Sequence, residues 1–162
     1  MKKDNIYKMM AILFLLDQWI KWIIQSQLSL GDEVKVIPHF FSLFYTKNTG
    51  GAFSIFENQS ILFIVFSLVV ILYLHQYIKK EKNILKLQGI SLGMILGGVF
   101  GNLLDRIIHH GVIDYLSFSF GKHHFPIFNF ADILITMGVI VGMIDLIIEE
   151  KKKKGSKKYE TS

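Results

Sequence analysis

Four long apolar stretches alternate with polar segments along the chain. They cover residues 6–24, 61–78, 87–104 and 127–148. As helices rising about 1.5 Å per residue, they are long enough to cross a hydrocarbon core roughly 30 Å thick. The pattern therefore predicts an all-α membrane protein with four transmembrane helices.

The first stretch also has the charged start of a secretory signal peptide, because Lys2 and Lys3 precede it. It contains Asp17 and Lys21, however, and it lacks a small-x-small cleavage site. We therefore expect this segment to remain in the protein as a membrane anchor.

The segment between the first two stretches has a different period. Residues 33–36 alternate between charged and apolar side chains, an aromatic-rich run follows at 40–45, and a glycine turn follows at 48–51. Alternation that ends in a glycine turn is typical of a short strand or hairpin. We predict a small β-like platform in this loop, lying on the outer membrane surface.

Glycines recur every four residues along the third stretch, at Gly89, Gly93, Gly97 and Gly101. Small residues at this spacing form one stripe on a helix and let helix backbones approach closely in lipid. A packing seam explains this stripe better than a chemical role. The third helix is therefore expected at the centre of the bundle.

Composition agrees with a membrane protein and removes several chemistries. The 162 residues are 51% hydrophobic, with a mean hydropathy of +0.41, which is too apolar for an ordinary soluble domain. The chain has no cysteine, so disulfides, thiolate metal sites and a cysteine nucleophile are excluded. We divide it into a transmembrane domain, 1–150, and a basic cytoplasmic tail, 151–162.

The net charge of +5 would suggest nucleic-acid binding in a soluble protein, but here the lysines lie in blocks beside the apolar stretches. Thirteen of the 18 basic residues fall in the amino-terminal segment up to Lys8, between the second and third stretches, or in the tail. The positive-inside rule then places both termini in the cytoplasm and the two longer loops outside. We expect membrane lipid, and no nucleic acid, as a partner.

With this topology, ten polar residues meet at one depth near the outer interface. An ionisable residue inside a span costs about 2.5–3.5 kcal/mol, so such a group requires partners or a function. Part of the group can be scaffolding, because Asp17 and Lys21 are one helical turn apart and Asp105 adjoins Arg106. The ten residues are Asp17, Gln18, Lys21, Asn48, Asn102, Asp105, Arg106, Asp114, Asn129 and Asp132.

Asp114 and Asp132 differ from the other acids because only apolar and aromatic residues flank them. If folding brings them together in a poorly hydrated place, the pair should share one proton near neutral pH. One carboxylate could then activate water while its protonated partner polarises a carbonyl, as in aspartic proteases. From these residues alone, a structural acid or a proton relay remains open.

Two other functions compete with this hypothesis. A proton-coupled carrier would use the intramembrane acids as a relay. A metal-dependent peptidase would use imidazole and carboxylate ligands, but no HExxH occurs and adjacent histidine rings cannot easily share one ion. The histidines in question bracket Asp114 and are His109, His110, His123 and His124.

Five motifs in order give the chain a resemblance to lipoprotein signal peptidase, also called signal peptidase II, along nearly all of residues 6–148. The family's patterns are DQxxK, NxGxAF, GGxxGNxxDR, VxDF and FNxAD. Here they read DQWIK at 17–21, NTGGAF at 48–53, GGVFGNLLDR at 97–106, VIDY at 112–115 and FNFAD at 128–132. The departures are Gly51, where alanine is more usual, and Tyr115, where phenylalanine is.

The resemblance implies an aspartic endopeptidase that needs no metal or other cofactor. Such an enzyme removes the signal peptide of a lipidated prolipoprotein by hydrolysing the bond before a diacylglyceryl-modified cysteine. It also implies a multi-pass protein of the bacterial cytoplasmic membrane, with the site at the outer face, and we expect a monomer. The implied dyad is Asp114 and Asp132, the implied substrate-binding residues are Asn48, Asn102, Arg106 and Asn129, and the implied supporting residues are Asp17, Lys21 and Asp105.

Overall fold

Four long helices and a small sheet make up the protein, whose computed structural model describes residues 1–50, 59–121 and 123–160, with the backbone alone for 154–160. The last three residues of the NTGGAF motif, Gly51 among them, therefore lie outside the described residues. The helices are α1 (Lys3–Gln27), α2 (Ser60–Lys80), α3 (Lys86–His109) and α4 (Phe130–Glu160). The strands are β1 (Glu33–Ile37), β2 (Phe41–Asn48), β3 (Val112–Phe120) and β4 (His123–His124).

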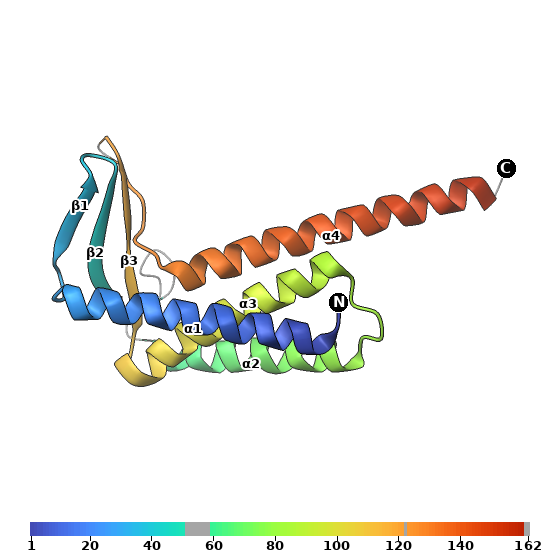
Figure 1. Cartoon of the computed structure of the whole chain (residues 1–162), viewed down its shortest axis with the longest axis horizontal. Coiled ribbons are helices and arrows are strands. Elements are labelled where there is room, and N and C mark those ends of the chain that lie inside the picture. The colour runs from blue at the N-terminus through green and yellow to red at the C-terminus, as the bar shows by residue number, and fades with distance from the viewer. Residues whose placement is uncertain (51–58, 122, 161–162) are drawn as a thin grey trace.

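The helices run side by side, and the sheet stands across one end of them (Figure 1). Both termini lie at the opposite end, away from the sheet. The segments predicted as outer loops are therefore together at one end of the molecule.

In the described part of the chain, three helices are long and apolar enough to cross a membrane: α2, α3 and α4 as far as Lys153. This supports a membrane protein. The first helix, α1, is 25 residues long, but it includes five charged residues, which lower its hydropathy. The count of four spans is therefore not established by length and composition.

The fourth helix differs from its predicted bounds at both ends. It begins at Phe130 rather than at 127, because Asn129 terminates the preceding loop as a helix cap. It also continues to Glu160, through the residues that we had separated as a tail.

The glycine stripe of α3 is a packing seam, as predicted. A Cβ atom at Gly97 would lie 3.0 Å from the Leu13 side chain and 3.2 Å from the Met10 carbonyl oxygen of α1. On the neighbouring face, a Cβ atom at Gly98 would collide with the Ala131 carbonyl oxygen of α4. The third helix therefore lies between α1 and α4, with its backbone close to both.

The sheet is antiparallel throughout, in the order β1-β2-β3-β4. The predicted platform in the first outer loop corresponds to β1 and β2, but β3 comes from the second outer loop, where we had predicted no strand. Between β2 and β3 the register places Thr46 opposite Asp114, beyond an irregularity that begins at Leu43. Pairing of the two loops thus brings Asp114 next to the end of β2.

Tyr115 and Ile113 of β3 are buried against Ile24 at the end of α1. This apolar cluster fixes one face of β3 to the helices. Because Asp114 lies between these two residues on a strand, its side chain points to the other face of the sheet.

Candidate active site

The amino end of α4 is closed by a reciprocal pair of hydrogen bonds between Asn129 and Asp132. The Asp132 backbone N–H donates to Asn129 Oδ1 at 3.0 Å, and the Asn129 backbone N–H donates to Asp132 Oδ2 at 3.2 Å. This is the geometry of a capping box, in which cap and third residue satisfy each other's amides. The Asp132 carboxylate is therefore fixed by the start of its own helix.

Asp114 is 3% exposed and accepts hydrogen bonds on both carboxylate oxygens. Asn48 Nδ2 donates to Oδ2 at 3.1 Å, and Asn129 Nδ2 donates to Oδ1 at 2.6 Å. Asn129 thus contacts both predicted catalytic acids. Its backbone N–H and amide oxygen bond to Asp132, and its amide nitrogen bonds to Asp114.

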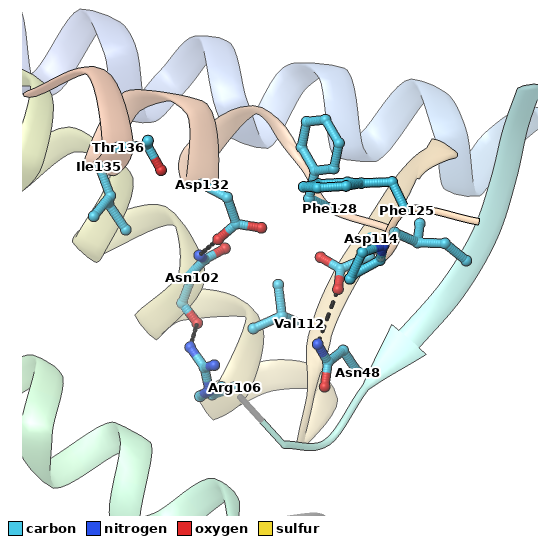
Figure 2. A pocket seen from close by; sticks show the side chains of 12 residues that line it. Asn48, Asn102, Arg106, Val112, Asp114, Phe125, Phe128, Asp132, Ile135 and Thr136 are labelled. Atoms are coloured by element: carbon cyan, nitrogen blue, oxygen red, sulfur yellow. Dashed lines mark hydrogen bonds between the residues drawn. The ribbon is translucent and has the colours of Figure 1, made fainter. Parts of the chain in front are cut away.

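The two acids face a common cavity of about 280 Å³ from different elements, β3 and α4. Figure 2 shows their carboxylates pointing toward one another across this space. Asn48, Asn102 and Arg106, for which substrate binding stays a prediction, also line it. The remaining wall is mostly apolar: Val112, Phe125, Pro126, Ile127, Phe128, Ile135 and Thr136.

Asn129 had been predicted to line the substrate pocket with the other asparagines. It is completely buried instead, and it is not part of the cavity wall. Its amide lies behind the two acids and joins them, because the cap position points its side chain back over the first turn of α4.

Burial and charge act together on Asp114. Removal from water raises the pKa of its carboxyl group, and the negative charge of Asp132 raises it further, to about 7. Hydrogen bonds from Asn48 and Asn129 oppose this rise, because they stabilise the charged form. A protonated Asp114 beside an ionised Asp132 is therefore accessible near neutral pH.

Lys21, at 1% exposure, lies between two buried carboxylates. Its Nζ atom is 2.8 Å from Asp17 Oδ2 and 2.7 Å from Asp105 Oδ2. The pairing of Asp17 with Lys21 was predicted. Asp105 was suggested to pair with its neighbour Arg106, but it pairs with Lys21 instead. Neighbouring residues on a helix point about 100° apart, so Asp105 faces α1 while Arg106 faces the cavity.

Asn102 connects this ion-pair cluster to the acids. Its Oδ1 accepts from Lys21 Nζ at 3.1 Å and from Asn129 Nδ2 at 3.2 Å, which leaves its amide nitrogen to donate. Asn102 Nδ2 then donates to Asp132 Oδ1 at 2.8 Å. The side chain is held in one orientation, since its oxygen faces two donors and its nitrogen faces a carboxylate.

All ten polar residues predicted to converge belong to this one network. Gln18, which we had not assigned to the site, is part of it through its Nε2 atom, which lies 3.2 Å from Asp17 Oδ2 and 3.1 Å from Asp105 Oδ1. Its position beside Asp17 in the DQWIK motif was the only sequence signal for this role.

Arg106 is buried at the cavity wall, and its guanidinium group makes few hydrogen bonds within the described residues. Nη1 and Nη2 donate long hydrogen bonds, of 3.4 Å and 3.3 Å, to the backbone oxygens of Asn102 and Gly50. The Phe63 ring lies 4.9 Å from the guanidinium carbon. Within the described residues, Arg106 Nε has no hydrogen-bond partner, which leaves a buried donor at the site.

Tyr115 is a further residue that sequence reasoning did not place at the site. Its hydroxyl oxygen accepts the Phe130 backbone N–H at 3.2 Å, in the first turn of α4. Burial raises the pKa of this phenol, so it stays protonated. The departure from phenylalanine thus adds a polar contact between β3 and the helix that carries Asp132.

The histidines of the second outer loop do not assemble with the acids. His124 Nδ1 lies 3.0 Å from Ser119 Oγ at the edge of the sheet. Across residues 1–50, 59–121 and 123–153, whose side chains are described, no three His, Asp or Glu side chains are grouped as metal ligands would be. The hypothesis of a metal-dependent peptidase therefore gains no support from the geometry.

Comparisons with known proteins agree with the motifs. The family model described as signal peptidase (SPase) II matches residues 9–148. Proteins named lipoprotein signal peptidase are similar over most of the chain: one from Bacillus pumilus is 39% identical, covering 93% of this chain and 97% of its own, and one from Listeria monocytogenes is 37% identical, covering 88% and 92%.

A solved structure described as a bacterial membrane enzyme is also similar, with a TM-score of 0.84 and 27% sequence identity. The match covers 93% of this chain and 92% of that one. Fold and sequence therefore agree with the family match over nearly the full length. The chain belongs to the signal peptidase II family and is a membrane peptidase.

Proposed function

We propose that this protein removes the signal peptide of prolipoproteins by hydrolysing the bond before a diacylglyceryl-modified cysteine, with Asp114 and Asp132 as the catalytic residues. The observation that carries the proposal is that Asp114 and Asp132 face one cavity and are joined behind it by Asn129. The relatives named lipoprotein signal peptidase support the choice of substrate.

The two acids differ in protonation before the reaction begins. Asp114 carries the proton, because its pKa is raised to about 7 by burial and by the charge of Asp132. Asp132 carries the negative charge, which hydrogen bonds from Asn102 and from the Asn129 backbone stabilise. One acid can therefore donate a proton while the other accepts one.

Hydrolysis then proceeds without a covalent enzyme intermediate. The water oxygen bonds to the carbonyl carbon as Asp132 takes a proton from that water, and Asp114 gives its proton to the carbonyl oxygen. The tetrahedral intermediate carries two hydroxyl groups. When the C–N bond breaks, Asp132 returns its proton to the departing amine, and Asp114 recovers a proton as the carboxyl group forms on the signal peptide.

Polar groups of the cavity wall bind the substrate backbone. An extended peptide at the membrane edge needs partners for its amides, because unsatisfied groups are costly there. Arg106 Nε supplies a donor that has no partner among the described residues. Asn48 and Asn102 line the same wall and complete the contacts, while Asn129 positions the acids.

All four helices cross the membrane in this proposal, with both termini in the cytoplasm. The charges of α1 do not prevent its insertion, because Lys21 is paired with Asp17 and Asp105 inside the bundle. The distribution of lysines supports the orientation. The acids then lie near the outer interface, where the junction of a membrane-spanning signal peptide and an acylated cysteine is held.

Single substitutions at the acids test the proposal. Asp114→Asn and Asp132→Asn should each lower cleavage of a lipidated precursor by at least a thousandfold, because each removes one of the two proton-transfer groups. The purified proteins would be incubated with lipidated and unlipidated precursor side by side. Only the lipidated form should be cut by the unaltered protein.

Asp145→Asn provides a matched control, because Asp145 is also a buried acid of α4 but lies about 20 Å from Asp132 by helical rise. This variant should cut at a rate near that of the unaltered protein. Near-normal cleavage by either catalytic variant, with unchanged thermal unfolding, would show that the assigned dyad is wrong.

A further inference from the structure

The cavity between the acids continues as a hollow over the sheet. A second cavity of about 670 Å³ shares several wall residues with the first, including both Asn48 and Asp114. A third, of about 440 Å³, shares Glu33 and His124 with the second. The three spaces therefore form one path that leads from the acid pair across β2 toward β1.

The two ends of this path have different chemistry. On the side of the helices the wall includes Phe128, just before α4, and Ile135 and Thr136, in the first two turns of that helix. Over the sheet, polar and charged side chains make up a larger share of the wall than they do near the acids. Its members there include Glu33, Thr46, Lys47, Ser117 and His124.

A precursor cut at the acids has the same two-sided character. The apolar signal peptide precedes the cleaved bond, and the polar segment of the mature protein follows it. We propose that the hollow over the sheet, which we name the exit groove, binds the residues after the cleaved bond in extended form, and that Glu33 selects positively charged side chains there. This inference rests on the proposed function.

The sheet register places Glu33 within reach of that segment. Asp114 pairs with Thr46 across β2, and Glu33 pairs with Phe44, two residues along the same strand. Two strand spacings of about 4.8 Å separate β3 from β1, and an extended chain advances about 3.3 Å per residue. The third residue after the modified cysteine therefore reaches Glu33.

Glu33 has the properties of a selecting group. It is exposed on the groove wall, and in the described part of the chain no basic side chain forms an ion pair with it. Lys47 lies nearer to the acids, since its register partner is Ile113, beside Asp114. A charge on the first residue after the cysteine is therefore closer to Lys47 than to Glu33.

Lipidated precursors that differ at one position test the inference. One pair carries Lys or Glu at the third residue after the modified cysteine, and a second pair carries the same change at the first residue. For the first pair, kcat/KM should favour Lys about two- to fivefold, the range that one exposed ion pair supplies. Glu33→Gln should remove this preference, and Glu33→Lys should reverse it.

The second precursor pair is an internal control, because its Lys-to-Glu ratio should not respond to changes at Glu33. Asp4→Lys is the protein control: it alters net charge equally, at an exposed position of α1 at the end opposite the sheet, and should leave both ratios unchanged. Equal ratios in all variants, with cleavage intact, would overturn the exit groove alone. Absence of cleavage of every precursor by the unaltered protein would instead overturn the proposed function.

Discussion

At the scale of single residues, Asn129 shows how one side chain can organise a site that it does not line. Its amide oxygen caps α4, and its amide nitrogen holds Asp114 and Asn102. Serine could replace the cap, but it has no second group to reach Asp114. The requirement for asparagine therefore comes from two simultaneous contacts with different elements.

The dependence of cleavage on pH should report the proton held by Asp114. Its pKa is raised to about 7, so the rate should fall about tenfold per pH unit above that value as the acid loses its proton. Asn48→Ala removes a hydrogen bond that stabilises the charged carboxylate. The pKa of Asp114 should then rise further, and the alkaline fall in kcat should move to higher pH.

The measurement is kcat as a function of pH for the unaltered protein, Asn48→Ala and Asn83→Ala. Asn83 is exposed between α2 and α3, so its variant should keep the original profile. An alkaline limb that stays in place or moves to lower pH in Asn48→Ala would contradict the assignment of Asp114 as proton donor.

The sequence predicted which polar residues would converge, because charges inside apolar stretches need partners. It predicted the Asp17–Lys21 pair from their spacing of one turn. It could not identify Lys21 as the partner of Asp105, because that contact depends on how α1 and α3 pack. The role of Gln18 was hidden for the same reason.

At the scale of elements, the packing of α4 on α3 places Asp132. The backbone of Ala131 lies directly against Gly98, so any side chain at that position would push α4 away. Asp132 follows Ala131 in the chain. The distance between the two proposed catalytic acids therefore depends on a glycine that touches neither of them.

Gly98→Ala should lower kcat by at least tenfold and destabilise the fold by about 1–3 kcal/mol, the usual range for overpacking. Gly89→Ala is the matched control in the same helix, because a Cβ atom there would meet only the Met1 side chain, at 3.0 Å and beyond. Cleavage assays and thermal unfolding in detergent would measure both effects. Equal behaviour of the two variants would show that the close approach at Gly98 does not position Asp132.

The strand β3 could not be predicted from the pattern of apolar and polar residues in the sequence. Its first four residues, 112–115, are all buried, so the alternation that revealed β1 is missing. The sequence contains a motif there, but apolar and polar residues do not alternate in it as they would in a half-exposed strand. The partner of β2 had to come from more than 60 residues away, and such long-range pairing leaves no local signal.

At the scale of the whole molecule, the sheet stands at one end of the bundle and the two termini lie at the other (Figure 1); the proposed function places the sheet outside and the termini in the cytoplasm. Three helices have the length and hydropathy of spans, and α1 is joined to one of them, α3, by the buried ion pair between Lys21 and Asp105. The orientation of this arrangement is open to direct measurement, because the sequence has no cysteine.

Single cysteines at Lys35 and Lys82 should react differently with a membrane-impermeant maleimide. Both positions are exposed, one on β1 and the other between α2 and α3. In intact cells Lys35→Cys should be labelled, and Lys82→Cys should be labelled only after the membrane is opened. The reverse pattern would invert the proposed topology, and labelling of both in intact cells would exclude a single crossing by α2 between them.

The capping box at Asn129 has a consequence for biogenesis. Asp132 takes up its position only when the last helix has started and docked on α3, more than 120 residues into the chain. A nascent protein that is still entering the membrane thus lacks one of the two proposed catalytic acids in its final position. Under the proposed function, peptidase activity begins only at the final step of assembly, so an unfinished copy does not cleave neighbouring polypeptides during insertion.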